Sequence, residues 1–479
     1  MGAQITFGSR FDYDGIVDRL PAGGYVRLRG NRSDLLGQIY KCRKMRDDPH
    51  RYAGYGRVLA ELVGKDLQEF PRVFQHLADY EDLAPADSLL ISRYFAWRRQ
   101  GEAPSIGWVI CSSDAEESRA RAFVRVTGDL DHTFVCGQSG SGKSFALGTL
   151  LERHLLYGEE KMIILDFNSD YVNLDRAMAV IPAANRPRLF DRATCAKALR
   201  RFRLIKDSIC IISPRRRTGL SKIRPSDLAP EHLAALINLN SASNPSEFSE
   251  FATALSDLGK PKYSWPDIVR RVDDSTDDGA LASRLDASGV IDWSIWCARG
   301  ERSLTDLIRD PAIECLVIDL EQFDEEERAT LALAVLHCIW TRRAQRDKTL
   351  IVVDEAHNLC QRGPTGRLLT HLARNLRRIA AEGRKYRIRM MIATQKPQKI
   401  HPEVAEECRS VLLMRLGASS DLKHLIDGFR GAPEELIRLA PDLEKGEAII
   451  WGALVPSPTL LKIDGRLLGE GRSLKRTGK

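Results

Sequence analysis

The sequence lacks the features by which secreted and membrane-spanning proteins are usually recognised. Its ten cysteines are scattered and none forms a Cys-x-x-Cys pair. We therefore predict free thiols in a reducing cytosol, with no disulfide framework and no zinc site. The N-terminal stretch MGAQITFGSRFDYDG holds no apolar segment long enough for a signal peptide. The longest uncharged apolar run, residues 329–340, is well short of the ~20 residues that cross a bilayer, so no membrane anchor is expected.

The composition is that of an ordinary globular protein. Hydrophobic residues make up 43% and charged residues 29% of the chain, which is enough to bury a substantial core. A length of 479 residues predicts two or three domains. The net charge of +7 is mildly basic, which is compatible with a nucleic-acid partner but does not argue for one.

The pattern of apolar residues changes near residue 125. Before it, short runs such as residues 24–28, 88–91 and 106–110 are separated by turn signals, which predicts strands of a small β-barrel or sandwich. After it, uncharged apolar strands alternate with amphipathic helices, which is typical of a parallel sheet covered on both faces. These expected strands are residues 133–136, 162–165, 314–318, 350–353 and 390–393. The predicted fold class is therefore α/β.

The strand signals disappear between about residues 225 and 310, where the sequence favours helices. We therefore predict an α/β core that is interrupted by a helical insertion and followed by a polar arm. The expected segments are an N-terminal β-barrel (1–125), the first part of the core (126–224), the insertion (225–310), the second part of the core (311–465) and a basic C-terminal tail (466–479).

One segment matches the phosphate-binding pattern G-x-x-x-x-G-K-[ST] in full. It consists of Gly137, Gln138, Ser139, Gly140, Ser141, Gly142, Lys143 and Ser144. Glycines allow the backbone N–H groups to converge on phosphate oxygens, and the helix that follows adds its positive end. Lys143 would reach the β and γ phosphates, and Ser144 would offer a hydroxyl to Mg²⁺. The predicted cofactors are ATP and Mg²⁺.

A second segment supplies carboxylates. The apolar run 350–353 ends in Asp354 and Glu355, which would hold Mg²⁺ and polarise the attacking water respectively. A strand that ends in acidic residues before a helix is also common without any catalytic role. Asp166 follows the strand after the phosphate loop and is a further candidate to face the nucleotide, as is Asp170, although either would also serve as a helix cap.

With these motifs in order, the sequence resembles the HerA branch of the HerA/FtsK superfamily of hexameric DNA-pumping ATPases. The resemblance rests on Val-Asp-Glu-Ala-His (353–357), Ile-Ala-Ala-Glu-Gly-Arg-Lys-Tyr (379–386), Met-Ile-Ala-Thr-Gln-Lys-Pro (391–397) and His-Pro-Glu-Val (401–404). It implies a RecA-like core behind a small β-barrel, a hexameric ring and double-stranded DNA as the substrate. It also implies a separate partner, either a NurA-type nuclease or an effector enzyme of antiviral defence.

The resemblance implies roles for two more residues. Arg384 lies where the family carries the arginine that reaches the ATP of the neighbouring subunit, although a solvated arginine is the alternative. Gln395 lies where a polar sensor of the γ phosphate is expected, with a plain strand-end amide as the alternative. The sequence departs from the family at residues 166–171, where Asp-Phe-Asn-Ser-Asp-Tyr replaces the frequent Asp-Pro-His-Gly-Glu-Tyr, so the geometry of that loop is left open.

The basic residues do not by themselves establish contact with DNA. Seven arginines and lysines lie between Arg374 and Arg389, and a second cluster occupies residues 215–217. Such a density would suit a pore that contacts phosphates, but surface and interface helices look the same. Two other functions therefore stay open: an ATP-gated scaffold that activates an effector with little translocation, and a protein- or RNA-directed pump of the same superfamily.

Overall fold

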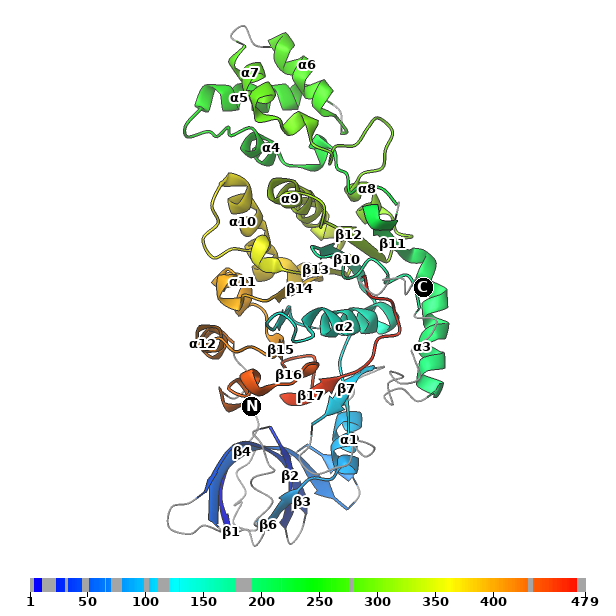
Figure 1. Ribbon diagram of the computed structural model, residues 1–479, viewed down its shortest axis with the longest axis vertical. Helices are drawn as coiled ribbons and strands as arrows, with labels where there is room; N and C mark the ends of the chain where they lie inside the picture. The colour runs from blue at the N-terminus through cyan, green and yellow to red at the C-terminus, as the bar shows by residue number, and fades with distance from the viewer. Residues whose placement is uncertain are drawn as a thin grey trace, which may run out of the picture.

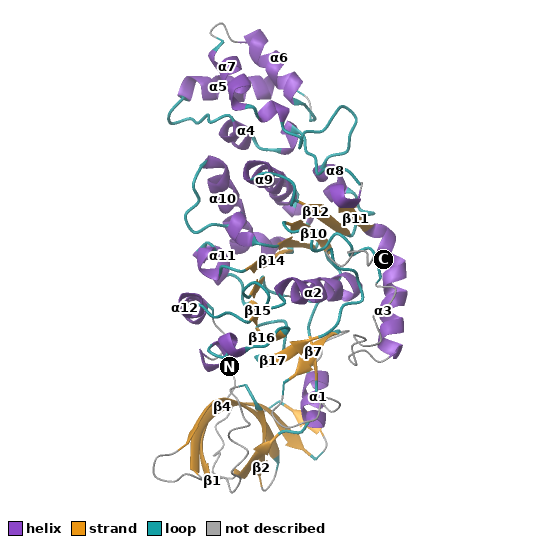
Figure 2. Ribbon diagram, in the orientation of Figure 1, coloured by secondary structure: helices purple, strands orange, loops and turns teal. Residues whose placement is uncertain are grey.

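The molecule is elongated, with a curved sheet at one end, a large sheet flanked by helices in the middle and a group of helices at the other end (Figure 1, Figure 2). The computed structural model describes residues 4–10, 23–30, 33–44, 51–64, 66–69, 80–98, 103–110, 120–128, 130–177, 192–216, 218–259, 261–275, 279–429 and 434–471.

The N-terminal sheet is antiparallel and six-stranded, with the order β1-β4-β3-β2-β6 and with β5 paired to β4. Its strands are β1 (Gln4–Arg10), β2 (Tyr25–Gly30), β3 (Asp34–Lys44), β4 (Arg51–Val63), β5 (Asp66–Gln68) and β6 (Tyr80–Pro85). Buried polar contacts fix this sheet to the rest of the chain. The hydroxyl of Tyr25 lies 3.0 Å from Oγ of Ser457, and Nε2 of Gln38 donates to the carbonyl of Pro458 at 2.5 Å.

The short run 88–91 was predicted to be a strand, and this prediction is wrong. The residues form the start of helix α1 (Ser88–Trp97), where Asp87 caps the first turn by accepting a hydrogen bond from the N–H of Leu90 at 2.7 Å. Leu90, Ile91, Tyr94 and Phe95 are buried. Their spacing places them on one helical face, and a four-residue apolar run could not reveal that period.

The second sheet is eleven-stranded, and it contains every strand expected from the uncharged apolar runs after residue 126. Its order is β11-β12-β10-β13-β14-β9-β15-β16-β17-β7-β8, parallel from β11 to β15 and antiparallel beyond. The strands are β7 (Ser105–Val109), β8 (Arg121–Phe123), β9 (Thr133–Cys136), β10 (Lys161–Asp166), β11 (Ile209–Ile212), β12 (Cys315–Asp319), β13 (Thr349–Val353), β14 (Ile388–Thr394), β15 (Ser410–Met414), β16 (Glu447–Trp451) and β17 (Thr459–Ile463).

Strands β7 and β8 belong to this large sheet, whereas the sequence grouped their residues with the N-terminal barrel. Leu461 of β17 pairs with Val109 of β7, so the pairing joins segments about 350 residues apart in the chain. Such a long-range pairing leaves no local signal in the sequence.

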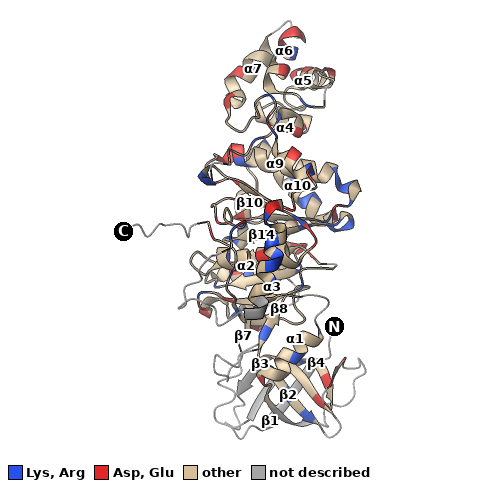
Figure 3. Ribbon diagram, turned by 90° about the vertical axis from the view of Figure 1, so that its right-hand side faces the viewer, with Lys and Arg blue, Asp and Glu red and all other residues tan. Residues whose placement is uncertain are grey.

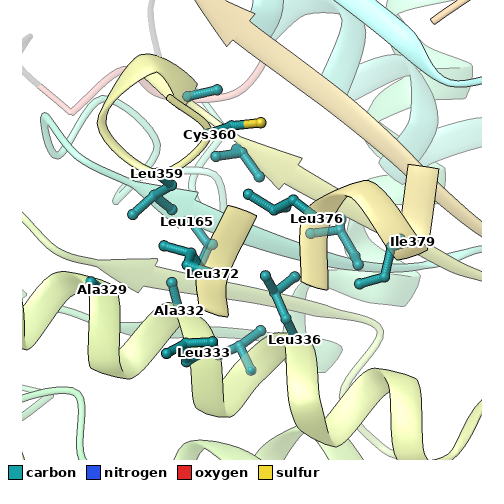
Figure 4. Packing of buried hydrophobic residues seen from close by; sticks show 14 of the residues in the cluster. Leu165, Ala329, Ala332, Leu333, Leu336, Leu359, Cys360, Leu372, Leu376 and Ile379 are labelled. Atoms are coloured by element: carbon teal, nitrogen blue, oxygen red, sulfur yellow. The ribbon is translucent and has the colours of Figure 1, made fainter. Parts of the chain in front are cut away.

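The parallel strands are buried on both faces, as their uncharged sequences predict. Alternate residues point into two separate hydrophobic cores: Phe134 and Ile351 into one, Val135 and Val352 into the other. The first core is closed by α9 (Glu325–Thr341) and α10 (Arg367–Glu382), and Figure 4 shows Leu333 and Leu336 of α9 packed towards Leu372 and Leu376 of α10, with Leu165 next to Leu372. The second is closed by α2 (Lys143–Tyr157) and α3 (Arg192–Ile205).

The segment between β11 and β12 is helical, as expected from its sequence. It contains α4 (Pro230–Leu236), α5 (Pro245–Asp257), α6 (Trp265–Ser275), α7 (Ala280–Ser288) and α8 (Leu304–Arg309). Its apolar residues, including Leu233 and Trp265, belong to the same core as α9 and α10. The helices α4 to α7 form the end of the molecule farthest from the N-terminal sheet (Figure 1).

The beginning of the C-terminal tail is packed against the core, whereas the sequence predicted a polar arm. Arg466 and Leu468 are buried, and the N–H groups of Leu467 and Leu468 both donate to Oε2 of Glu152 in α2, at 2.7 and 2.8 Å. Residues 472–479 lie outside the described residues. The remaining helices, α11 (Pro402–Glu406), α12 (Ser419–Gly428) and α13 (Glu434–Ile437), flank β15 and β16. Within the described ranges, no helix combines the length and apolarity needed to span a bilayer.

Candidate nucleotide site

The phosphate-binding pattern forms a tight loop between β9 and α2. Gly140 and Gly142 adopt φ angles of 77° and 99°, which glycine reaches without strain. A side chain at Gly137 would lie 2.8 Å from Cβ of Met414, so the loop also needs glycine where it packs on β15. Gly142 directly precedes α2, which has 15 residues. The loop therefore lies at the N-terminal end of this helix, where the helix dipole is positive. The loop thus has the strand–loop–helix context and the positive φ angles that the pattern requires, and its binding of phosphate stays a prediction.

Lys143 lies against the carboxylates that follow β13. Its Nζ is 2.7 Å from Oδ1 of Asp354 and 3.1 Å from Oε1 of Glu355, and all three side chains are buried. Burial alone would lower the pKa of Lys143, but the two carboxylates outweigh it and hold the pKa above its ordinary value. The lysine is therefore charged. The structure thus brings together the two segments that the sequence separates by about two hundred residues.

Glu355 is held by a small polar network. Nε2 of Gln395, at the end of β14, donates to Oε1 of Glu355 at 2.6 Å. Nδ1 of His357 lies 3.3 Å from the other carboxylate oxygen and 3.2 Å from the hydroxyl of Thr394. The sequence singled out Gln395 but missed His357 and Thr394. His357 stands two residues after Glu355, and this closeness in sequence was the available signal.

Asp166 has a different environment from the one expected of a nucleotide ligand. Its carboxylate accepts hydrogen bonds from the backbone N–H groups of Asn168, Asp170 and Tyr171, at 3.3, 3.0 and 2.8 Å. Burial raises its pKa well above the ordinary value, against the lowering effect of the hydrogen bonds. Asp166 therefore shapes the loop after β10, which corresponds to the capping alternative. Through that loop the hydroxyl of Tyr171 reaches Oδ2 of Asp354 at 3.4 Å.

The residues around Lys143 fit a nucleotide and a magnesium ion. Oγ of Ser141 is buried and has no hydrogen-bond partner in the described part of the chain, so it can engage a phosphate or a water. Oε2 of Glu355 accepts no hydrogen bond there either, and its one close polar neighbour is Nδ1 of His357 at 3.3 Å. Ser144 and Asp354 would supply oxygen ligands to the ion. Magnesium bound to nucleotides usually takes one or two protein carboxylates and completes its shell with phosphate oxygens and water. A site with so few protein ligands is therefore appropriate.

Arg384 is not part of this cluster. It precedes β14, at the amino ends of the parallel strands, whereas the phosphate loop follows β9 at their carboxyl ends. The length of β14 separates the two edges by roughly 20 Å. Arg384 pairs with Asp131 and lines a cavity of about 420 Å³ together with Arg387, Arg389 and Glu160. Within one chain it does not reach Lys143.

Several of the basic residues that the sequence offered for DNA contact form ion pairs with carboxylates. Arg377 forms a bidentate pair with Glu403, at 2.7 and 2.6 Å. The other paired arginines are Arg389 with Glu160, Arg215 with Glu321 and Arg216 with Asp175. Arg217 lies outside the described residues. The basic run 374–389 is therefore not a uniform phosphate-binding surface.

The fold and the phosphate loop define a P-loop ATPase core. Residues 105–339 match the family described as "Helicase HerA, central domain". The chain is 28% identical over 169 residues to a probable helicase of Methanocaldococcus jannaschii, a match that covers 32% of each chain. It is also 28% identical to the DNA double-strand break repair helicase HerA of Sulfurisphaera tokodaii, over 33% of this chain and 34% of that one.

A solved structure has the same fold. It is VirB4 of Thermoanaerobacter pseudethanolicus, which is 16% identical, with a TM-score of 0.51 over 77% of this chain and 98% of that chain. The matched segments span about a third of the length of the curated relatives. The chain therefore carries a P-loop core whose residues 105–339 are similar to the central domain of HerA.

Proposed function

We propose that the chain hydrolyses ATP and uses the energy to move double-stranded DNA through a ring of identical subunits, a hexamer. The observation that carries the proposal is the buried contact of Lys143 with Asp354 and Glu355, beneath a loop of P-loop geometry. The similarity to DNA double-strand break repair helicases supports duplex DNA as the substrate.

In this proposal each residue of the site has a distinct task. Lys143 binds the β and γ phosphates, and its charge balances the negative charge that develops during transfer. Ser144 and Asp354 hold Mg²⁺, which supplies further charge neutralisation when bound. Glu355 accepts the proton of the attacking water, and Gln395 keeps its carboxylate aligned by donating to Oε1 at 2.6 Å. Asp166 positions Tyr171 against Asp354.

The position of Arg384 supports the proposed ring. Because it lies on the opposite edge of the sheet from Lys143, it can complete a nucleotide site only in a neighbouring subunit. A guanidinium that neutralises the γ phosphate is worth ~10³–10⁵ in rate in nucleotide hydrolases. We further propose that the N-terminal sheet closes into a small β-barrel, and that the boundary between it and the motor lies near residue 100, since β7 belongs to the large sheet.

We propose that the ring works in the cytoplasm with a separate enzyme, either a NurA-like nuclease in DNA end processing or an effector of antiviral defence. The free thiols of the described cysteines suit a reducing compartment. Any cleavage would belong to the partner, because the motifs found in this chain account for ATP hydrolysis alone.

The test is ATP turnover with and without nucleic acid. Duplex DNA should raise turnover in proportion to its length, while single-stranded DNA and RNA of equal length should have less effect. Glu355→Gln, measured in parallel, shows how much turnover belongs to this site. The ATP-gated scaffold would be identified instead if duplex DNA left ATP turnover unchanged and ATP binding activated a bound effector.

A further inference from the structure

A cavity of about 390 Å³ lies where the helical insertion meets the two helices that cover the first core. It is lined by three histidines and three arginines, which we call the His–Arg cavity: His232 of α4, His337 of α9, His371, Arg374 and Arg378 of α10, and Arg343 of the turn after α9. Glu231 is the single acid among its lining residues. In Figure 3 basic residues are visible along α10.

The three imidazoles form a compact group. The ring of His232 lies 5.6 Å from that of His337 and 5.3 Å from that of His371, centroid to centroid. Burial, followed by the neighbouring histidines, lowers the pKa of His232 to about 3, so this ring is neutral. Its Nδ1 accepts a hydrogen bond from the N–H of Ala229 at 3.4 Å, which leaves Nε2 as the donor. The described residues include no group of three or more histidines, cysteines or acids placed to hold a metal ion, and this holds for the three imidazoles too.

Acids in the described part of the chain balance the charges of the three arginines only in part. Arg343 and Arg378 lie over the ring of Trp340, at 4.7 and 4.5 Å, but neither they nor Arg374 forms an ion pair with a carboxylate in the described part of the chain. Burial and the nearby charge of Arg343 lower the pKa of Arg378, against the raising effect of the carboxylates of Glu382 and Glu231. Arg377 provides the contrast within the same helix, because it pairs with Glu403. Three arginines and three histidines face one another here with Glu231 as the only acid in the lining, and like charges that are only partly balanced favour the binding of an anion.

We propose that the His–Arg cavity is a second phosphate-binding site, separate from the loop around Lys143. Arginine presents planar pairs of donors that match phosphate oxygens, and neutral imidazoles add N–H donors or take up a proton when an anion binds. The phosphate would contact His232 of the insertion on one side and Arg374 and Arg378 of α10 on the other, and would thereby bridge the two elements. Its source is either the backbone of duplex DNA or a free polyphosphate such as a nucleotide. The inference concerns binding and does not require that the chain hydrolyse ATP.

The test compares Arg374→Gln/Arg378→Gln with Arg377→Gln, a matched change on the same helix outside the cavity. Each protein is saturated with a non-hydrolysable ATP analogue so that the loop at Lys143 is filled. Duplex DNA binding is then measured over a range of salt concentrations, and inorganic tripolyphosphate binding is measured by calorimetry. Thermal melting and DNA-free ATP turnover report on the fold and on the nucleotide site independently. The single variant Arg374→Gln, which alters an exposed side chain, repeats the test if the double variant is unstable.

Weakened duplex binding by about tenfold or more in the double variant, with a salt slope smaller by about two, would identify the DNA backbone as the source. If the double variant no longer releases heat on binding tripolyphosphate but binds duplex DNA as before, the ligand is a free phosphate compound. Arg377→Gln should behave like the wild type in both measurements. The proposal is overturned if the double variant binds both probes like the wild type, or if Arg377→Gln loses as much as the double variant does.

Discussion

The ends of β10 and β13 are neighbours in one parallel sheet, and each delivers an aspartate, yet the two aspartates have different tasks. Leu165 pairs with Val353, so Asp166 and Asp354 follow directly on adjacent strands and both are fully buried. Asp354 meets the ammonium group of Lys143 at 2.7 Å. Asp166 instead accepts hydrogen bonds from three backbone N–H groups of its own loop.

The difference comes from the residues that follow each strand. After Asp166 the chain turns back on itself, with Ser169 at φ 55°, and directs its N–H groups at the carboxylate. After Asp354 the chain continues through Glu355 at φ 44°, which turns a second carboxylate towards Lys143. Position at a strand end is therefore not enough to assign an acidic residue to catalysis. The local turn sets how many backbone N–H groups the carboxylate accepts: three for Asp166, but only that of Glu355, at 2.9 Å, for Asp354.

The comparison extends to the opposite edge of the sheet, where the largest effect is expected. Arg384→Ala should lower ATP turnover by ~10³-fold or more, because the neighbouring site would lose its trans cation. Mixing Arg384→Ala subunits with Glu355→Gln subunits should restore part of the activity, since some interfaces then combine an intact arginine with an intact carboxylate. Turnover is measured across mixing ratios. Absence of recovery at every ratio would contradict the trans assignment.

At the end of β13, Glu355→Gln should lower turnover by ~10²–10⁴-fold, because the amide cannot accept the proton of the attacking water. ATP affinity should stay within a few-fold of the wild type, since Lys143 still binds the phosphates. Turnover and equilibrium ATP binding are measured on the same preparation. Normal hydrolysis by this variant would reject Glu355 as the base.

Gln395→Ala should have a smaller effect. Removing a hydrogen bond to a charged group costs ~1.5–3 kcal/mol, which corresponds to a loss of about tenfold or more if that energy aligns the carboxylate of Glu355. The loss should appear in the maximal rate and not in ATP affinity. Gln395→Glu, which places a second carboxylate beside Glu355, should be more severe, and equal rates for the two variants would argue against the alignment role.

Asp166→Asn should affect stability more than catalysis. The amide retains one acceptor oxygen, so at least one of the three backbone N–H groups loses its partner, at a cost of ~1–3 kcal/mol in the free energy of unfolding. Turnover should change by no more than a few-fold, whereas Asp354→Asn should abolish most of it. The free energy of unfolding, from chemical denaturation, and the ATP turnover rate are measured for both variants and compared. If Asp166→Asn lowered turnover as much as Asp354→Asn, Asp166 would have to be assigned to the nucleotide site after all.

The parallel core and the phosphate loop could be predicted because their signals are local. Uncharged runs such as residues 162–165 and 350–353 are strands buried on both faces, and the glycines at 140 and 142 have the positive φ angles that the pattern requires. The close approach of Lys143 to Asp354 follows once both segments are placed at the carboxyl edge of one sheet.

The features that the sequence missed depend on distant partners. The strand at 105–109 joins the large sheet only because β17 lies beside it, and residues 466–471 are packed because Glu152 of α2 accepts the N–H groups of residues 467 and 468. The run 88–91 is too short to reveal its helical period, and the cap at Asp87 decides its structure. The carboxylate of Asp166 accepts three backbone hydrogen bonds because of the turn at residues 166–171. The sequence of this turn differs from the one that is frequent in the HerA family, so the family pattern could not predict these bonds.

The central claim is that a nucleoside triphosphate binds at the loop closed by Lys143, against Asp354 and Glu355. Equilibrium binding of ATP with Mg²⁺ to Lys143→Ala tests it most directly, with Glu355→Gln as the variant that should still bind. The account predicts that Lys143→Ala loses ATP binding by ~100-fold or more while the fold is retained by thermal melting. A folded Lys143→Ala protein that binds ATP as tightly as the wild type would contradict it.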